Sequence, residues 1–562
     1  MADPELHRPH RMLRRRGAPM LLQRWAWLPA ASALVLLLPV LFLHQGVEAL
    51  PLSTRGRWMV DAVSGQRVKL RCVNWAAHMP AVVPEGLDKQ PLDDIVARVA
   101  ALGFNCVRLT WATYLFTRPR YENLTVAGSL SALGLDEAAA GLAANNPFVS
   151  ALAVREAYAE VVRAIGEAGL MAVLDNHVSR PQWCCASNDG NGFFGDLFFD
   201  PEEWLRGLEA VATRFRGSPQ VVGMSMRNEL RGANQSEAAW RRYVTRGART
   251  IHRANPDALI IVSGLSYDTD LSFLAARPLP SRFDDKLVLE AHWYSFGKRE
   301  DWASRSPDRV CADAAREFEN RAGFVTRGDD GSSWPLFVSE FGVDQRGTNR
   351  ADNRFLSCFL AFAAERDLDW GMWALQGSYY WRNGQPGFAE TYGVLDANWD
   401  LPRNPRFPER FRLIQGMLQD PDSQVPAYLI IYHPLSGQCL LADDTSNVVL
   451  GDCRSRSKWS YGGNGTAILS AESSLCLRTV GDGSPVVLSP SCSDDQSAWT
   501  MISSSGFRIA GMDAGGSRLC LQGSSGDSPT VETRQCPCLG DPICSENPQR
   551  QWFRFVPSNV VV

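Results

Sequence analysis

The sequence predicts an α/β protein in which a (β/α)8 TIM barrel is followed by an all-β domain of the β-trefoil type. The chain has 562 residues, which is more than one ordinary domain holds. Eight short apolar runs alternate with helical stretches from about residue 53 to residue 420. After Pro426 the chain becomes rich in Gly, Ser, Asp and Cys, and one cysteine pattern occurs three times. We therefore divide it into residues 1–49, 53–420 and 427–562.

The composition is that of a folded protein without a basic surface. Hydrophobic residues make up 45% of the chain and charged residues 21%, which argues against disorder. The net charge of −4 leaves no basic excess, so nucleic acid is not expected as a partner. Fourteen cysteines fit an oxidising compartment.

The first part, residues 1–49, is interpreted as a signal peptide or a signal anchor. A basic stretch precedes the apolar run Trp25–Leu43, and the small residues around Ala49 resemble a cleavage site. The run is close to the ~20 residues that span a bilayer, so an uncleaved anchor is the alternative, and membrane attachment is expected only then. The remainder is expected to be secreted and extracellular. Three glycosylation sequons agree with export, and they begin at Asn123, Asn234 and Asn464.

The apolar runs of the second part are expected to be strands. They are Val68–Asn74, Asn105–Thr110, Met171–Asn176, Val221–Met226, Leu259–Ser263, Leu287–His292, Leu336–Glu340 and Trp370–Leu375. Helical stretches lie between them, among them Pro91–Ala101, Ala151–Gly169, Pro201–Phe215, Glu237–Ala254 and Asn349–Arg366. Near-continuous apolar strands are typical of parallel, buried sheets, and eight β/α repeats favour a closed barrel. A doubly wound open sheet is the alternative, but no Gly-rich phosphate loop follows any of the strands.

Polar residues stand where the predicted strands end, which is where barrel enzymes carry their chemistry. Glu229 ends the fourth strand and Glu340 ends the seventh. Two facing carboxyl groups are what glycoside hydrolysis requires, because one protonates the leaving oxygen and the other attacks the anomeric carbon. The other polar or aromatic strand-end residues are Arg108, His177, Asn228, His292, Tyr294 and Trp373.

This ordered set resembles glycoside hydrolase family 5, the cellulase-type retaining enzymes. The stretches Val222–Gly232 and Asn188–Gly195 are similar to a plant subgroup whose members carry a C-terminal ricin-B-like module. The resemblance implies that Glu229 is the acid/base, that Glu340 is the nucleophile, and that the substrate is a β-linked polysaccharide or glycoconjugate. It also implies roles for the remaining set: Arg108 and Tyr294 orient Glu340, Asn228 binds the hydroxyl next to the anomeric carbon, His177 and His292 line the subsite, and Trp373 is its aromatic platform.

Two other functions stay open at this point. A transglycosylase would use the same covalent intermediate with a sugar acceptor in place of water, and an idle barrel would only bind carbohydrate. No cofactor or metal is expected, because His177 and His292 lack a third ligand motif and no zinc spacing is present. His78 is interpreted as a structural histidine.

The segment from Val178 to Pro201 contains the adjacent pair Cys184 and Cys185. Vicinal cysteines rarely bond to each other, so we expect separate partners, with Cys311 and Cys358 as candidates. Cys72 and Cys106 lie in neighbouring predicted strands and would then be buried thiols, although the pairing of these six cysteines stays open. Trp183, Phe193 and Phe194 are expected to form part of a cleft wall. The equally weighted alternative is that this segment is a structural loop held by disulfides and has no part in the cleft.

The third part repeats Cys-Leu, Cys and Trp about every 40 residues. This pattern is similar to the ricin-B lectin family and implies three units stapled by their own disulfides, plus a small loop closed by the last two cysteines. The candidate cysteines are Cys439, Cys453, Cys476, Cys492, Cys520, Cys536, Cys538 and Cys544. The Gln-x-Trp ending of that family is missing or shifted, and Asp443 and Asp444 come late for a sugar contact. These departures argue against galactose-type binding, and a second sugar ligand at this module stays an open alternative. A barrel cut after Asp420 should be folded and active if the module is only a binder.

Overall fold

The structure is a computed structural model that describes residues 51–280, 283–328, 332–442, 447–523, 529–544 and 546–561. The predicted signal segment, residues 1–49, and the two aspartates Asp443 and Asp444 lie outside the described residues. In the ranges that are described, no helix has the length and apolar character needed to cross a membrane.

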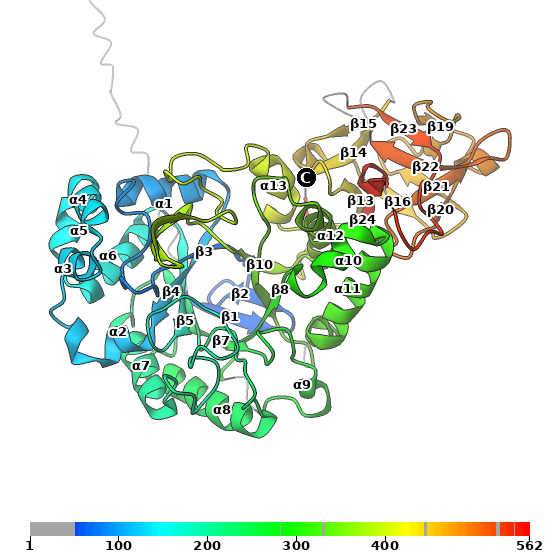
Figure 1. The fold of residues 1–562 in the computed structure, drawn as a ribbon. Helices are drawn as coiled ribbons and strands as arrows, with labels where there is room; N and C mark the ends of the chain where they lie inside the picture. Colours follow the sequence, from blue (N-terminus) through cyan, green and yellow to red (C-terminus); the bar gives the residue numbers. More distant parts are fainter. Residues whose placement is uncertain are drawn as a thin grey trace, which may run out of the picture. The chain divides into compact units, whose positions relative to one another are not determined.

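Eight parallel strands close into a barrel, in the order β10-β3-β4-β5-β6-β7-β8-β9. Figure 1 labels β3, β4, β5, β7, β8 and β10 of this barrel. The strands are β3 (Arg71–Trp75), β4 (Cys106–Ala112), β5 (Met171–Val178), β6 (Val221–Ser225), β7 (Leu259–Ser263), β8 (Leu287–Trp293), β9 (Leu336–Phe341) and β10 (Asp369–Met372). They match the eight predicted runs in order, so the barrel is confirmed and the open-sheet alternative is wrong. Every residue of β4 to β9 is buried, as near-continuous apolar runs require.

The five helical stretches named from the sequence are confirmed as α1 (Leu92–Ala101), α6 (Val154–Glu167), α7 (Pro201–Arg214), α8 (Glu237–Ala254) and α12 (Arg350–Arg366). Two further long helices, α11 (Pro307–Arg321) and α13 (Phe407–Gln415), were not named in advance. Side-chain caps begin several of them: Asp200 accepts from the N–H of Glu203 at α7, and Ser236 accepts from the N–H of Ala239 at α8. These caps fix where each helix leaves its loop.

Further elements were not predicted. Four short helices follow β4, namely α2 (Thr113–Thr117), α3 (Val126–Ala132), α4 (Asp136–Asn145) and α5 (Pro147–Ala151), while α9 (Phe273–Ala276) and α10 (Arg299–Ser304) lie in later loops. Two hairpins flank the barrel sequence, β1 (Leu52–Arg55) with β2 (Trp58–Asp61), and β11 (Ser378–Arg382) with β12 (Gln385–Ala389). The 3-10 helices are Pro119–Tyr121, Phe296–Lys298, Gly323–Thr326, Cys453–Ser455, Asp495–Ser497 and Pro548–Gln551.

A buried ionic cluster ties the end of α12 to the segment before β3. Asp367 caps α12 in the left-handed conformation, and its carboxylate accepts from Lys69 Nζ at 2.6 Å and from Arg67. The same carboxylate accepts the N–H groups of Leu418 and Gln419 at 2.8 and 2.7 Å. Burial alone would favour the neutral acid, but the charges of Lys69 and Arg67 outweigh it and lower the pKa of Asp367 to about 2.

Replacing Asp367 by asparagine should destabilise the fold by about 3–5 kcal/mol at pH 7, because two buried cations lose their partner while the backbone conformation remains acceptable. The depressed pKa means that the carboxylate stabilises the wild type fully above its unfolded pKa, near 3.8, and that this is lost as pH falls through about 2. Denaturant unfolding at pH 7 and pH 2 measures both effects. Asp422→Asn, at an exposed ion pair, should change stability by less than about 1 kcal/mol; an equally small effect of Asp367→Asn at pH 7 would contradict the assignment.

The C-terminal region is built mostly of strands. They are β13 (Tyr428–His433), β14 (Gln438–Ala442), β15 (Val448–Gly451), β16 (Trp459–Tyr461), β17 (Thr466–Ser470), β18 (Cys476–Arg478), β19 (Val487–Ser489), β20 (Ala498–Met501), β21 (Ile509–Met512), β22 (Arg518–Gly523), β23 (Val531–Arg534) and β24 (Arg554–Ser558). The leucines that follow the first cysteine of each repeat, Leu440, Leu477 and Leu521, share one core cluster. Trp459 and Trp499 donate their indole N–H to the carbonyls of Leu440 and Leu477, at 3.1 and 2.8 Å, so two repeats make the same contact.

All fourteen cysteines lie in the described ranges and are paired. The C-terminal pairs are Cys439–Cys453, Cys476–Cys492, Cys520–Cys536 and Cys538–Cys544. Earlier in the chain the pairs are Cys72–Cys106, Cys184–Cys185 and Cys311–Cys358. The expectation of separate partners for Cys184 and Cys185 is therefore wrong, as is that of buried thiols at Cys72 and Cys106. Cys72 and Cys106 face each other across neighbouring strands, and Cys311 and Cys358 lie on α11 and α12, which leaves the vicinal pair to each other.

The barrel and the C-terminal region share one apolar core. Tyr432, Phe507 and Trp552 belong to the same buried cluster as the barrel helices. Buried polar contacts reinforce it: Arg508 bonds Asp308 of α11 at 2.7 Å, and Gln549 donates to Ser357 of α12 at 2.7 Å. The C-terminal region therefore packs against the barrel helices as part of one core. Folding of a barrel cut after Asp420 stays a prediction, and the shared core argues against it.

Candidate active site

A cleft of about 880 Å³ opens where the barrel strands end. The residues that line it come from the ends of strands β5 to β10, from the loops that follow them and from the β11–β12 hairpin. Among them are seven of the eight residues predicted from the sequence, namely Glu229, Glu340, His177, Asn228, His292, Tyr294 and Trp373. The eighth, Arg108, is fully buried directly behind Glu340. The structure therefore brings the whole predicted set together.

Glu340, on β9, is held by hydrogen-bond donors on both oxygens. Arg108 Nη1 donates to Oε1 at 2.8 Å and the Tyr294 hydroxyl donates to Oε2 at 3.0 Å. Burial opposes the charge of Arg108, but the carboxylates of Asp175, Glu290 and Glu340 raise its pKa, so the guanidinium is a fixed cation. Both donors favour the ionised form of Glu340.

Glu229 lies four residues after the end of β6, in the left-handed conformation with φ 44°. Its N–H donates to Asp268 Oδ2 at 3.0 Å, and its carbonyl accepts from Arg231 Nη1 at 2.7 Å. Its side chain forms a hydrogen bond with His292, whose Nδ1 lies 3.0 Å from Oε1 of Glu229. A strained backbone held on both sides is typical of residues whose direction matters for function.

Burial raises the pKa of both Glu229 and Glu340 to about 7. The hydrogen bonds distinguish the two residues, because Arg108 and Tyr294 stabilise a carboxylate at Glu340, whereas the side chain of Glu229 contacts His292. The first proton to leave the pair therefore leaves Glu340, and Glu229 keeps its proton. Burial also lowers the pKa of His292, so its neutral ring can accept from protonated Glu229 or donate to the ionised form.

One oxygen of Glu229, one of Glu340 and a ring nitrogen of His292 all lie within 4.8 Å of one another. This spacing leaves room for one anomeric carbon and its leaving oxygen between the carboxyl groups. The pair can therefore combine an acid with a nucleophile at one carbon atom.

Asn228 and His177 form the polar floor beside this pair. The Asn228 Oδ1 accepts from Arg108 Nη2 at 3.1 Å, which points the amide NH2 toward His177 Nε2, 3.5 Å away. His177 Nδ1 bonds Asp175 at 2.6 Å, and the ring stacks on Trp373 at 5.3 Å between centroids. Burial lowers the pKa of His177 well below 6.5, so this ring is neutral. His78 lies beneath it, fully buried against Thr110, which agrees with a structural role.

Several residues of the site were not predicted from the sequence. Asp268 contacts Glu229 from a loop in which Ser266, Tyr267 and Asp268 all have positive φ, and no sequence motif indicates this conformation. Arg382, from the unpredicted β11–β12 hairpin, lies 3.4 Å over the Trp183 ring. Trp183 lines the cleft as expected, whereas Phe193 and Phe194 pack into the core and do not.

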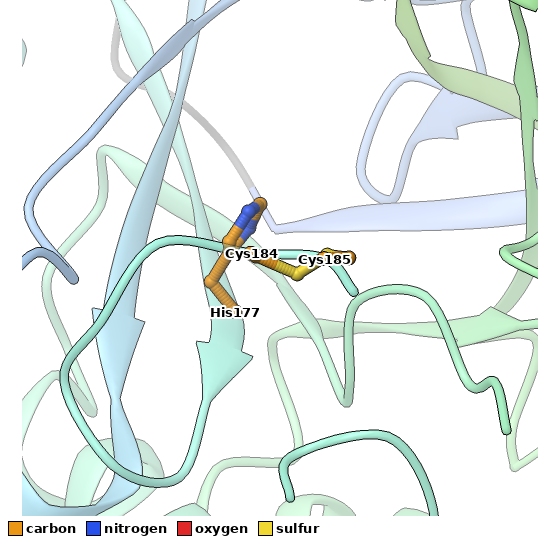
Figure 2. A group of neighbouring side chains, drawn as sticks. All are labelled: His177, Cys184 and Cys185. Atoms are coloured by element: carbon orange, nitrogen blue, oxygen red, sulfur yellow. A yellow bond between two sulfur atoms is a disulfide. The ribbon is translucent and has the colours of Figure 1, made fainter. Parts of the chain in front are cut away.

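Two groups of described residues have the spacing of a metal site, His177 with Cys184 and Cys185, and Glu229 with His292 and Glu340. In the first group the sulfurs are bonded to each other, as Figure 2 shows, so neither offers a thiolate. In the second, Arg108 and Tyr294 already occupy both oxygens of Glu340. The donor sets thus suit proton transfer better than metal binding.

The chain matches the family profile described as Cellulase (glycosyl hydrolase family 5) over residues 64–378. A "Glycosyl hydrolase 5 family protein" from Chamaecyparis obtusa is 45% identical over 544 residues, which cover 94% of this chain and 97% of the relative. An "Endoglucanase" from Paenibacillus polymyxa is 21% identical over 63% of this chain and 84% of its own length.

Solved structures share the barrel fold. The catalytic domain of the major endoglucanase from Xanthomonas campestris pv. campestris has a TM-score of 0.51 at 21% identity, over 65% of this chain and 98% of that one. A cellotetraose complex of an endocellulase from Pyrococcus horikoshii has a TM-score of 0.51 at 19% identity, over 65% and 99%. Together with the family profile and the plant relative, the barrel and its carboxylate pair place this chain in glycosyl hydrolase family 5, and the protein is a glycoside hydrolase.

Proposed function

We propose that the protein is a retaining β-glycosidase that hydrolyses β-linked glucan chains by double displacement, with Glu340 as nucleophile and Glu229 as acid/base. The observation that carries this proposal is the asymmetric pair: two buried carboxyl groups with oxygens within 4.8 Å, one held by a cation and a phenol and the other free to exchange a proton. Carboxyl groups about 5–5.5 Å apart favour retention, whereas inversion needs about 6.5–9.5 Å.

In the first step Glu340 attacks the anomeric carbon while protonated Glu229 gives its proton to the departing oxygen. The glycosidic bond breaks and an ester bond forms between the sugar and Glu340. In the second step Glu229, now ionised, takes a proton from water as the water oxygen attacks the same carbon. The ester breaks, Glu340 becomes a carboxylate again, and Glu229 is protonated for the next cycle.

The substrate class is supported by the relatives and by the cleft. The Paenibacillus relative is described as an endoglucanase, and the Pyrococcus enzyme binds cellotetraose. Trp373 and Trp183 line the cleft and offer faces on which a sugar ring can stack. Turnover of defined β-1,4-, β-1,3- and β-1,3/1,4-glucan, mannan and xylan oligosaccharides by wild type and Glu340→Gln in parallel tests the proposal. Cleavage of a glucan by the wild type alone supports it, and cleavage of mannan or xylan only contradicts the substrate class.

The pH profile of kcat/KM should be bell-shaped, because the reaction needs Glu340 ionised and Glu229 protonated. The pKa of Glu229, raised to about 7 by burial, sets the alkaline limb, so activity falls as pH rises through about 7. Protonation of Glu340 sets the acid limb. With an activated aryl β-glycoside, Glu229→Gln should lose the alkaline limb and keep the acid limb; an unchanged alkaline limb would contradict the acid/base role.

Transfer to a sugar acceptor is a second candidate, favoured by one aromatic surface. Phe296 stacks on Tyr294 with centroids 4.6 Å apart and is 55% exposed in the cleft, so it offers an aromatic platform for a second sugar. Product analysis at high oligosaccharide concentration distinguishes the two reactions, because transfer lengthens the chain and hydrolysis shortens it.

We also propose that residues 53–420 and 427–562 act as a catalytic domain and a ricin-B-like trefoil, supported by the repeated Trp-to-Leu contact and by the three intra-repeat disulfides. Sugar binding by that region remains a proposal. Secretion is supported by the disulfides and by the exposure of the sequon residues Asn123, Asn234 and Asn464. Glycan release followed by a mass shift tests modification at these three asparagines.

A further inference from the structure

The disulfide between Cys184 and Cys185 forms part of the cleft wall. Cys184 is buried and Cys185 half-buried, and both line the cleft beside Trp183. Figure 2 shows the sulfur–sulfur bond next to His177, which comes from the end of β5, while the cysteines come from the loop that follows. Neither step of the proposed reaction uses these sulfurs, so the reaction itself does not explain why they line the cleft.

The sulfurs contact the amide of Asn228. Its Nδ2 lies 3.7 Å from Cys184 Sγ and 3.6 Å from Cys185 Sγ, while its Oδ1 is held by Arg108 on the opposite side. A disulfide sulfur is a weak acceptor, so it orients the NH2 group without satisfying it. One N–H of the amide points to His177 Nε2, 3.5 Å away, and the other stays available for a stronger acceptor, such as a sugar hydroxyl in the cleft.

The disulfide loop is tied to the segment that carries Glu229. Arg231 is fully buried, and it donates from Nε to the carbonyl of Ala186 at 3.0 Å and from Nη1 to the carbonyl of Glu229 at 2.7 Å. Arg227 donates to the carbonyl of Asn191, further along the same loop, at 2.6 Å. The sulfur wall is thus fixed relative to the acid/base residue by two buried guanidinium groups.

We propose that the Cys184–Cys185 disulfide contacts the sugar bound next to Glu229 and fixes the donor direction of Asn228, which makes it a specificity-determining part of the cleft. The polarizable sulfurs pack against the C–H surface of the ring. Asn228 then donates to the hydroxyl adjacent to the anomeric carbon. This inference rests on the proposed function, because it needs the anomeric carbon between Glu229 and Glu340.

Kinetics on a matched substrate pair tests this role. Wild type should prefer 4-nitrophenyl β-glucoside over its 2-deoxy analogue, because only the former offers the hydroxyl to Asn228. In the double variant Cys184→Ser/Cys185→Ser, the ratio of kcat/KM for the glucoside to kcat/KM for the 2-deoxy analogue should fall at least tenfold. Most of this fall should come from a lower kcat/KM for the glucoside. The control Cys538→Ser/Cys544→Ser, which removes a short-loop disulfide of the C-terminal region, should keep the wild-type preference. A folded Cys184→Ser/Cys185→Ser variant with the wild-type preference would overturn the inference.

A second measurement needs no change at the cysteines. Full-length Glu340→Gln is treated with dithiothreitol with and without saturating cellotetraose, and the released thiols are alkylated and assigned by mass spectrometry. Bound cellotetraose should slow reduction of Cys184–Cys185 at least tenfold and leave the rate at Cys538–Cys544 unchanged. If Cys184–Cys185 is reduced at the same rate with and without bound cellotetraose, the proposed contact between the sulfurs and the sugar is wrong. Failure of the proposed function shows itself separately, as turnover by Glu340→Gln.

Discussion

Replacing Glu340 by glutamine is expected to lower kcat by at least about 10⁴-fold, since the covalent intermediate cannot form without a carboxylate. The amide keeps the size of the side chain, and Tyr294 can still donate to its oxygen. Substrate binding should therefore persist while turnover is lost. Initial rates on an activated aryl β-glycoside, together with calorimetric binding of an oligosaccharide, measure the two properties separately.

Chemical rescue distinguishes the two carboxyl groups. Azide should rescue Glu340→Ala by attacking the substrate directly and giving an α-glycosyl azide, because the product is inverted once. With Glu229→Ala, azide should attack the covalent intermediate and give a β-glycosyl azide. The opposite pattern of anomers would exchange the roles of Glu229 and Glu340, and near-normal turnover by Glu340→Gln would remove Glu340 from the reaction.

Deleting residues 421–562 is expected to abolish folding of the barrel, despite the separate appearance of the two regions in the sequence. Besides the disulfide-bonded Cys439 and Cys453, six apolar side chains of the C-terminal region lie in the core cluster of the barrel, namely Tyr428, Ile430, Tyr432, Phe507, Trp552 and Val556. At about 2 kcal/mol for each buried side chain, their loss costs on the order of 10 kcal/mol, which is comparable with the whole stability of a domain. Yield of soluble protein and thermal unfolding measure the outcome.

A point variant at the same interface separates packing from charge. Asp308→Asn weakens the buried contact to Arg508 and leaves the apolar core in place, so it should destabilise the full chain by about 3 kcal/mol and keep activity. A truncated barrel with wild-type activity and a similar melting temperature would contradict the structural role of the C-terminal region.

The barrel was predictable because its strands are buried on both faces and therefore leave continuous apolar runs in the sequence. The candidate site followed from one rule, that the carboxyl ends of parallel strands meet at one end of a barrel. Arg108 lies two positions before the end of the apolar run Asn105–Thr110, and its long, fully buried side chain still reaches the carboxylate of Glu340. The position of such a residue depends on where it stands along its strand, and the apolar run in the sequence predicts that position well.

What escaped prediction depends on loops and on tertiary packing. Asp268 meets Glu229 only because three successive residues adopt the left-handed conformation. The pairing of Cys184 with Cys185 follows from where the other cysteines lie in space, since Cys72 and Cys311 already have partners. The shared core of the two regions could not be predicted either, because each residue that contributes to it has the sequence pattern of an ordinary interior residue of its own region.

The central claim, retention through Glu340 and Glu229, is tested most directly by the stereochemistry of the first product. Proton NMR of wild-type protein with a β-glucan oligosaccharide resolves the anomer released before mutarotation. The spacing of the two carboxyl groups predicts the β-anomer first, followed by slow equilibration. Initial appearance of the α-anomer would contradict the double displacement.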